Sequence, residues 1–401
     1  MLTLDKIYQA SHVLRSVIRK TDLIQAPKLC PDCNLFLKTE NLQVTGSFKV
    51  RGAYYMMSQL TEEEKARGVI ACSAGNHAQG VALAAAKNHM KALICLPDGA
   101  PISKVEATKS YGAEVCMVKG VYDDAYNKAV ELQKEHNYTF VHPFDNENVI
   151  AGQGTIGLEI LDQMADVDAV IVPIGGGGLI SGVAACAKQI NPRIQIIGVQ
   201  AEGAPAIANS FRTGERTPSD TVHTIADGIA VKTPGEKTFE YIKQYVDRVV
   251  TVSDDEIASA VLLLLERCKQ VVETSGAAPL AAVLNNKVDV KGKKVVCVLS
   301  GGNIDVSFIH KIVEKGLITR CRQLKFSVLM PDAPGALEHF SHIVAQQNAN
   351  IILFQHDRVQ TDLEIGEAII HVVCEVGGVD HAKRLIDTLT DDGYKVFTSQ
   401  I

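Results

Sequence analysis

The sequence has no tryptophan, no long apolar run and no run of lysine and arginine. No stretch approaches the roughly 18 apolar residues that suggest a membrane-spanning helix. The first twenty residues alternate apolar and charged side chains and lack the apolar centre of a secretory leader, so we expect a cytoplasmic protein. A net charge of −6 without basic clusters argues against nucleic acid or a membrane surface as a partner.

The chain has 401 residues, of which 46% are hydrophobic and 21% are charged. This composition is typical of a globular protein, and the length suggests two or three domains with cores that need no disulfide or structural metal. Most of the ten cysteines lie in apolar stretches, which favours buried free thiols. Cys30 and Cys33 form a lone CPDC, and no second pair follows at zinc-ligand spacing.

Residues 68–320 alternate short apolar, β-branched runs with helical segments. The runs are GVIACS, KALICLP, AEVCMVK, DAVIVPI, QIIGVQA and KVVCVLS. Strands that are apolar on both faces belong to parallel sheets covered by helices on both sides. The pattern predicts an α/β fold with doubly wound parallel sheets.

From Lys325 onward the order of expected elements changes to strand, helix, strand, strand, helix, strand. In the segment 367–376, apolar and polar residues alternate with a period of two, which is typical of a half-buried antiparallel strand. The helix that follows places Ala382, Leu385 and Leu389 on one face, and Gly393 can end it. The tail therefore predicts a ferredoxin-like βαββαβ module over residues 325–401, separated from the first domain (1–320) by the polar stretch TRCRQ.

Two segments suggest groups that could react with or bind a substrate. Lys49 lies between Phe48 and Val50, and an amine in apolar surroundings becomes a better nucleophile, although such a lysine can equally extend its amine to solvent. In CSAGNHAQG, a strand ends and a helix begins around Ser73, where backbone N–H groups can bind an anion. An ordinary capped strand–helix turn remains the alternative at this second segment.

Two further segments contain consecutive glycines after buried strands. Gly175, Gly176, Gly177 and Gly178 follow the strand at 169–174 and precede a helix, which is typical of a phosphate-binding loop. The spacing is not the G-x-G-x-x-G of dinucleotide-binding folds, although Glu202 stands about 25 residues on, near where a ribose-binding acid would lie. In VLSGGN, Ser300 follows another buried strand and offers a hydroxyl for a ring nitrogen, or forms a simple turn.

Together these segments supply an amine, an anion-binding turn, a phosphate loop and a hydroxyl, the set that pyridoxal phosphate needs. The motifs SFKVRGA, SAGNHAQG, HPFDNENVIAGQGTIGLEI, GGGGL, IADGIAVK, ETSGAA and LSGGN stand in the order found in threonine ammonia-lyases. Residues 1–320 thus resemble these fold-type II pyridoxal-phosphate enzymes, of which serine racemase is a close relative. The resemblance implies a small lobe, at about residues 45–140, inserted in a larger lobe. The tail resembles a single ACT domain, a module that often binds amino acids.

The resemblance also implies a role for individual residues. Lys49 would form the internal aldimine and then act as acid and base at the substrate, and Phe48 would flank the cofactor ring. Ser300 would contact the pyridine nitrogen, and Asn76 the phenolic oxygen. The phosphate would be bound by Gly175, Gly176, Gly177, Gly178 and Leu179. The substrate carboxylate would be held by the turn that comprises Ser73, Ala74, Gly75, Asn76 and His77.

Departures from the serine racemase pattern predict what this chain does not do. Racemases place a serine, the base on the opposite face, where this chain has Ala74, so we expect weak racemisation. Their cation site uses the glutamate that corresponds to Glu202 and an aspartate six residues on, and that position is Ala208 here. We therefore expect no metal. Glu273 in ETSGAA should lie near the ring without an assigned role.

The sequence thus predicts a pyridoxal-phosphate-dependent lyase that deaminates L-threonine to 2-oxobutanoate and ammonia, with L-serine as a poorer substrate. A serine or hydroxyaspartate dehydratase, a racemase and a non-catalytic amino-acid sensor remain alternatives. In the tail, Asp332, Gly335, Ala336 and Leu337 stand at the turn before the first helix, where free N–H groups could bind an effector such as isoleucine or valine. By analogy with the family we expect a homotetramer or homodimer and a role in isoleucine biosynthesis.

Overall fold

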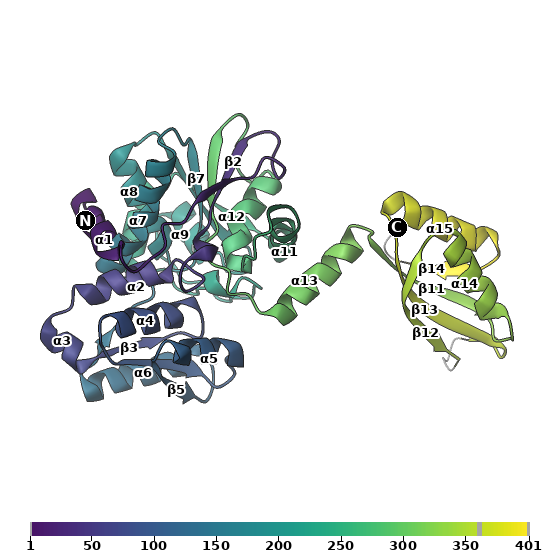
Figure 1. Ribbon diagram of the computed structural model, residues 1–401, viewed down its shortest axis with the longest axis horizontal. Helices are drawn as coiled ribbons and strands as arrows, with labels where there is room; N and C mark the ends of the chain where they lie inside the picture. The colour runs from purple at the N-terminus through teal and green to yellow at the C-terminus, as the bar shows by residue number, and fades with distance from the viewer. Residues whose placement is uncertain (1, 359–362, 399–401) are drawn as a thin grey trace. The chain divides into compact units, whose positions relative to one another are not determined.

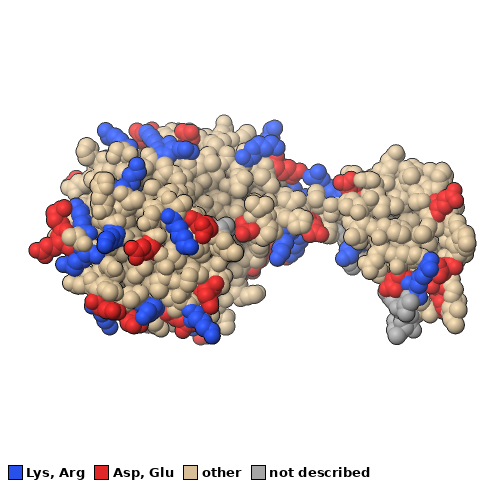
Figure 2. Space-filling view, turned by 60° about the horizontal axis from the view of Figure 1, so that its bottom comes forward, with Lys and Arg blue, Asp and Glu red and all other residues tan. Residues whose placement is uncertain are grey.

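The computed structural model describes residues 2–358 and 363–398 (Figure 1). Its internal contacts separate it into two compact units, Met1–Ile304 and Asp305–Ile401. Within the described residues, no helix is both long enough and apolar enough to cross a membrane. On the face shown in Figure 2, lysines and arginines are interspersed with aspartates and glutamates over the first unit.

The first unit contains a six-stranded sheet. In spatial order the strands are β1 (Leu23–Gln25), β2 (Asn34–Lys38), β10 (Lys294–Val298), β7 (Ala169–Pro173), β8 (Gln195–Ala201) and β9 (Arg248–Val252). Neighbouring strands are parallel except for the antiparallel pair β1 and β2. Strand β7 is buried along its whole length, as expected for a central parallel strand covered on both faces.

A second, four-stranded sheet is formed by the segment between β2 and β7. In spatial order its strands are β5 (Glu114–Val118), β4 (Ala92–Pro97), β3 (Val69–Cys72) and β6 (Thr139–Phe140), and all of them are parallel. The chain thus leaves the first sheet, builds the second and returns. The predicted class of doubly wound parallel sheets is confirmed.

Helices cover both sheets. They are α1 (Leu4–Leu14), α2 (Lys49–Ser58), α3 (Glu62–Arg67), α4 (Asn76–Lys87), α5 (Ile102–Ser110), α6 (Tyr122–His136), α7 (Glu147–Gln163), α8 (Gly178–Ile190), α9 (Ala206–Thr213), α10 (Glu236–Tyr245), α11 (Asp254–Leu263) and α12 (Thr274–Leu284), with the short helical turns η1 (Glu40–Leu42), η2 (Asp227–Ile229) and η3 (Leu264–Cys268). Figure 1 shows α7 and α8 on one side of β7 and α11 and α12 on the other. Helix α2 packs against both α4 and α7.

The second unit begins with α13 and forms an antiparallel sheet with two helices. Its elements are α13 (Val306–Thr319), β11 (Gln323–Pro331), α14 (Ala336–Gln346), β12 (Asn350–Asp357), β13 (Glu367–Glu375), α15 (Val379–Asp391) and β14 (Lys395–Phe397). The strand order is β12-β13-β11-β14, which is the ferredoxin-like arrangement. The boundary proposed from the sequence falls at the end of α13, and the last residue of the expected final strand, Ser399, lies outside the described residues.

The contact between α7 and α8 depends on glycine. A Cβ atom at Gly182 in α8 would lie 2.3 Å from the carbonyl oxygen of Ile150 and 2.5 Å from the amide nitrogen of Gly154, both in α7. Backbone atoms cannot move aside as the end of a flexible side chain can. The two helices therefore approach as closely as they do only because this position has no side chain.

We expect Gly182→Ala to lower the free energy of unfolding by about 1–3 kcal/mol, the usual cost of forcing atoms into a packed core. Gly99→Ala is the matched control, because a Cβ atom at Gly99 meets no heavy atom within 4 Å. Urea unfolding followed by circular dichroism compares the two. Equal midpoints would contradict the packing argument.

Candidate active site

A cavity of about 1240 Å³ lies in the first unit, and all four segments singled out from the sequence line it. Phe48 and Lys49 come from the start of α2, and Ser300 follows β10. The turn 73–77 lies between β3 and α4, and the loop 175–179 lies between β7 and α8. The three segments that follow strands stand at the carboxyl ends of parallel strands, where ligands bind in open α/β sheets.

Lys49 is the first residue of α2, and its side chain is half-buried in the cavity wall. Its Nζ atom donates a hydrogen bond to the carbonyl oxygen of Pro143 at 3.1 Å and lies 5.3 Å from the centre of the Phe48 ring. Burial lowers the pKa of this amine to about 8, although the nearby Glu273 carboxylate acts in the opposite direction. About a tenth of the amine is therefore uncharged and nucleophilic at pH 7, far more than for an ordinary lysine.

Glu273 stands beside this amine, and sequence reasoning gave it no role. It immediately precedes α12 and is only 6% exposed. Asn76 Nδ2 donates to both carboxylate oxygens, at 2.8 and 2.9 Å, and Asn303 Nδ2 donates to Asn76 Oδ1 at 2.8 Å. Burial raises the pKa of Glu273 to about 7, against the lowering effect of the Asn76 hydrogen bond. Glu273, Asn76 and Asn303 are far apart in the sequence, and only the fold brings them within hydrogen-bond distance.

The turn 73–77 forms the N-terminal end of α4. The Gly75 amide donates to Ser73 Oγ at 3.2 Å, which shapes the turn, and a Cβ atom at Gly75 would meet nothing within 4 Å. The imidazole of His77 is buried and its Nε2 atom lies 2.8 Å from the Val141 carbonyl oxygen. Burial and the Lys49 charge lower the pKa of His77 to about 3, so the ring is neutral at pH 7. Because the Val141 carbonyl oxygen holds the imidazole, the group that His77 can offer to an anion is its backbone N–H.

The glycine loop 175–178 has no space for side chains. A Cβ atom at Gly176 would lie 2.3 Å from the Phe144 ring, and one at Gly177 would lie 2.9 Å from Thr238. Gly177 also has a φ of +98°, which glycine adopts without strain. The amides of Gly175–Leu179 donate to no acceptor among the described residues, and this stretch lines the cavity. Free N–H groups at the start of α8 are able to bind an anion.

Ser300 joins the strand β10 to the segment that carries Lys49. Its carbonyl oxygen accepts a hydrogen bond from the Phe48 amide at 3.1 Å, and its side chain, which is 3% exposed, lines the cavity. The hydroxyl of Ser275 also lines the cavity and is buried without a partner among the described residues. Both hydroxyls can therefore form a hydrogen bond with a polar atom of a ligand.

Several other charged or ionisable lining residues were missed by sequence reasoning, among them Lys104, Asp227 and His142. Lys104 Nζ in α5 and Asp227 Oδ2 in η2 form an ion pair of 2.8 Å, which joins elements of the two sheets. His142 Nδ1 accepts a hydrogen bond from the Asp145 amide at 2.8 Å, and burial lowers its pKa to about 4. Nothing local in the sequence distinguishes these side chains from surface residues.

The residues in the cavity fit pyridoxal phosphate. The loop 175–179 presents free amides to a phosphate, Ser300 offers a neutral hydroxyl to a ring nitrogen, and Lys49 offers an amine with a lowered pKa. Outside this cavity, Glu202 Oε1 lies 3.8 Å from Lys287 Nζ. Within residues 2–358 and 363–398, no three His, Cys, Asp or Glu side chains converge as metal ligands would.

The expected effector residues lie in the second unit. Gly335, with a φ of +92°, immediately precedes α14, which starts with Ala336. Asp332 Oδ1 lies 3.3 Å from Arg358 Nε, and Leu337 is exposed. The turn thus combines a charged pair with an open helix N-terminus.

Comparison with known proteins relates the first unit to one family and the whole chain to one group of enzymes. The sequence model of the family "Pyridoxal-phosphate dependent enzyme" matches residues 14–301. An L-threonine ammonia-lyase of Thermotoga maritima is 47% identical over 398 residues, 99% of both chains. An L-threonine dehydratase (catabolic TdcB) of Staphylococcus aureus strain N315 is 47% identical over 79% of this chain and 93% of its own. The structure of a processed threonine deaminase isoform of Solanum lycopersicum is 39% identical, with a TM-score of 0.73 over 78% of this chain and 94% of that one.

The electrostatic interaction between Lys49 and Glu273 leads to a pH prediction. A lysine amine reacts only when deprotonated, so labelling of Lys49 by an amine-reactive reagent should rise with pH through a midpoint of about 8. Glu273→Gln removes a negative charge that favours the protonated amine, and the midpoint should therefore fall. Peptide mass spectrometry of the labelled protein gives the midpoint.

Glu236→Gln is the control, because Glu236 also lines the cavity but does not contribute to the pKa of Lys49. Its midpoint should match that of the unsubstituted protein. A midpoint that stays unchanged or rises in Glu273→Gln would contradict the assigned interaction.

Proposed function

The chain belongs to the pyridoxal-phosphate dependent enzymes and, among them, to the L-threonine ammonia-lyases, and from this membership we propose that Lys49 and the segments around it convert L-threonine to 2-oxobutanoate and ammonia. The observation that carries the proposal is the position of Lys49. Its amine, with a pKa lowered to about 8, lines the same cavity as the glycine loop and Ser300.

The cofactor would be held by side chains and amides already described. The amides of Gly175–Leu179 would bind its phosphate, Ser300 would contact its ring nitrogen, Asn76 its phenolic oxygen, and Lys49 its aldehyde carbon. Bound pyridoxal phosphate supplies an electron-accepting ring that stabilises negative charge at the substrate Cα. Because Ser300 is a neutral hydroxyl, it does not favour a protonated ring nitrogen as a carboxylate would. This weaker electron acceptor favours β-elimination over transamination.

The turn 73–77 orients the substrate. Backbone N–H groups at the start of α4 bind the carboxylate of threonine, since a helix N-terminus favours an anion. The open space over Gly75 leaves room for that carboxylate. Orientation of the substrate at this turn places its Cα proton within reach of Lys49.

Lys49 moves the protons of the reaction. Its uncharged amine takes the proton from Cα, and the resulting ammonium gives a proton to the departing Cβ hydroxyl, which leaves as water. The electrons of the C–H bond become the Cα–Cβ double bond of an enamine. Addition of water to the enamine then yields 2-oxobutanoate and ammonia. A pKa of about 8 allows the side chain to act as base and then as acid near neutral pH.

Ala74 favours lyase over racemase activity. It lines the cavity within the carboxylate-binding turn but has no group that can carry a proton. Inversion at Cα needs a second proton carrier on the opposite face, so racemisation is weak. L-Serine differs from L-threonine by one methyl group, and loss of a methyl contact weakens binding modestly, which makes serine a poorer substrate.

We expect Lys49→Ala to reduce 2-oxobutanoate formation from L-threonine by about 10²–10⁴-fold, the contribution of a positioned acid–base group. Product is measured as its hydrazone, with L-serine as a parallel substrate. Lys65→Ala is the control, because Lys65 lies in the exposed part of α3 and pairs only with Glu62 among the described residues. Full turnover by Lys49→Ala would refute the proposed role.

We further propose that the second unit is an ACT domain that binds a branched-chain amino acid, such as isoleucine, and so regulates the enzyme within isoleucine biosynthesis. Its ferredoxin-like topology supports this role, as does the relative from Thermotoga maritima, whose match extends through the tail. The N-terminus of α14 would receive the effector carboxylate through the amides of Gly335 and Leu337, since the Ala336 amide already donates to the Ala333 carbonyl oxygen at 3.2 Å. A homotetramer or homodimer stays a prediction from the family.

We expect isoleucine to bind the full chain in calorimetric titration and to change its turnover. Asp332→Ala should weaken binding, because this residue pairs with Arg358 beside the α14 turn. Glu364→Ala, elsewhere in the same unit, is the control. Equal binding by both variants, or no binding of isoleucine or valine to the unsubstituted chain, would argue against the effector site.

A further inference from the structure

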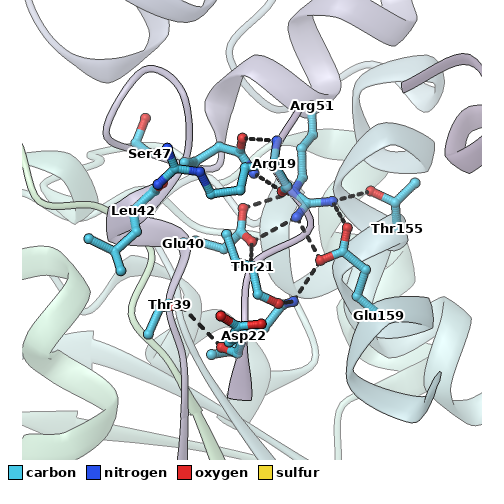
Figure 3. Close-up of polar contacts among 12 residues, drawn as sticks. Arg19, Thr21, Asp22, Thr39, Glu40, Leu42, Ser47, Arg51, Thr155 and Glu159 are labelled. Atoms are coloured by element: carbon cyan, nitrogen blue, oxygen red, sulfur yellow. Dashed lines mark hydrogen bonds and ion pairs between the residues drawn. The ribbon is translucent and has the colours of Figure 1, made fainter. Parts of the chain in front are cut away.

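A cluster of four buried charged side chains lies behind the start of α2, outside the cavity. Its members are Lys38, Glu40, Arg51 and Glu159, and we call it the Arg51 cluster. The side chains of Lys38, Glu40 and Arg51 are fully buried, and that of Glu159 is 13% exposed. Figure 3 shows Arg51 between the two carboxylates, with Glu40 on one side and Glu159 and Thr155 on the other.

Every N–H of the Arg51 guanidinium has an acceptor. Nε and Nη2 donate to the two oxygens of Glu40, both at 2.8 Å. Nη1 and Nη2 donate to the two oxygens of Glu159, at 2.7 and 2.9 Å, and Nη1 also donates to Thr155 Oγ1 at 3.1 Å. A guanidinium has five N–H donors in a rigid plane, so two carboxylates and one hydroxyl determine its position completely.

Lys38 completes the charge balance. Its Nζ atom donates to Glu159 Oε2 and to the Thr21 carbonyl oxygen, each at 2.6 Å. Two positive and two negative groups are thus buried together. Arg51 keeps its charge, since the carboxylates of Glu40 and Glu159 raise its pKa above its ordinary value despite burial. The carboxylates come from η1 and α7, so the cluster connects these two elements to α2.

The cluster acts on the turn of helix that carries Lys49. Arg51 is the third residue of α2, and Lys49 is the first. On the opposite side of the chain, a Cβ atom at Gly80 in α4 would lie 3.1 Å from the carbonyl carbon of Lys49. One at Gly152 in α7 would lie 2.6 Å from the carbonyl oxygen of Arg51. The first turn of α2 is therefore enclosed by α4 and α7 and joined to η1 and α7 through Arg51.

Stability alone does not explain these charges. Apolar side chains of similar volume often stabilise a core as well as or better than a buried ion pair. A cation in the first turn of a helix is also disfavoured by the helix dipole. An arginine that binds two carboxylates, each through two hydrogen bonds, fixes the position of its own backbone. An apolar side chain does not.

We propose that Arg51 is a positioning residue for the reaction, which holds the first turn of α2 so that the Lys49 amine meets cofactor and substrate in one orientation. The inference rests on the proposed role of Lys49. Arg51 itself lines no part of the cavity and touches no reacting atom. Its loss should therefore affect the geometry of the site more than the binding of threonine.

Arg51→Lys in the cofactor-loaded full chain tests the proposal, because lysine keeps the charge but not the planar fork. We expect kcat for L-threonine to fall by about 10–100-fold, the cost of a displacement near 1 Å, with KM changed far less. The visible circular dichroism per bound cofactor, which reports how rigidly the cofactor is oriented, should fall as well. This second signal is independent of turnover.

Ile160→Ala is the matched control for lost stability. Ile160 follows Glu159 in α7 but is buried in the core on another side of the helix. We expect a lower melting temperature with kcat and visible circular dichroism close to those of the unsubstituted enzyme. Equal losses of kcat in Ile160→Ala and Arg51→Lys at matched stability would show that Arg51 is only structural and would overturn the proposal.

Thr155→Val decides the matter if Arg51→Lys does not fold, because it removes one acceptor and leaves both ion pairs of Arg51 in place. A lower kcat with unchanged KM supports the proposal, and an unchanged kcat overturns it. Failure of the proposed function itself is distinguishable, since it would show as full turnover by Lys49→Ala, whatever the result at Arg51.

Discussion

The first turn of α2 is the segment on which the cavity depends. It carries Lys49, and it lies where α4 and α7 approach the chain so closely that Gly80 and Gly152 cannot bear a side chain without displacing backbone. The Phe48 amide donates to the Ser300 carbonyl oxygen, so this turn is also connected to β10. Contacts to both sheets therefore meet at one turn. An amine placed there has little freedom to leave the cavity wall.

Burial acts in opposite directions on the two ionisable groups beside each other in the cavity. It lowers the pKa of the Lys49 amine to about 8 and raises that of the Glu273 carboxyl to about 7. Both groups are thereby brought close to neutral pH, where each can exist in either protonation state. Asn76 holds the carboxylate and is itself held by Asn303, which keeps the carboxylate at a defined place relative to the amine. Low solvation is thus the largest influence on the pKa of each of these two groups.

The second unit follows a different design. Its sheet is antiparallel and buries one face, with the buried residues Leu324, Phe326, Val328 and Met330 alternating with less buried neighbours along β11. A relative from Thermotoga maritima matches through this region, whereas the Staphylococcus aureus relative matches 79% of the chain. Relatives of the first unit are thus found both with and without a match to the tail.

Much of the fold of this protein can be predicted from short stretches of its sequence. Continuous apolar strands, glycine loops at strand ends and the period-two pattern of the tail determine the two sheet types, because they depend on residues adjacent along the chain. The four segments that line the cavity were found in the same way, since three combine a strand end with glycine and the fourth has a lysine amine between apolar residues. Parallel topology brings the loop 175–179 and Ser300 together, because they follow the neighbouring strands β7 and β10, whereas the turn 73–77 follows β3 of the other sheet and joins them only in the folded unit.

Other features have no local signal. Glu273, Asn76 and Asn303 are separated by up to 227 residues, and only the fold brings their polar atoms within hydrogen-bond distance. The same is true of Arg51 and Glu159, which lie 108 residues apart, because a charged residue in a helix looks the same in sequence whether it faces solvent or a buried partner. Local sequence thus decides the elements and the chemical groups that they carry. Tertiary packing decides which groups lose their water, which of them are paired and how far each pKa moves, because desolvation and charge pairing depend on neighbours in space.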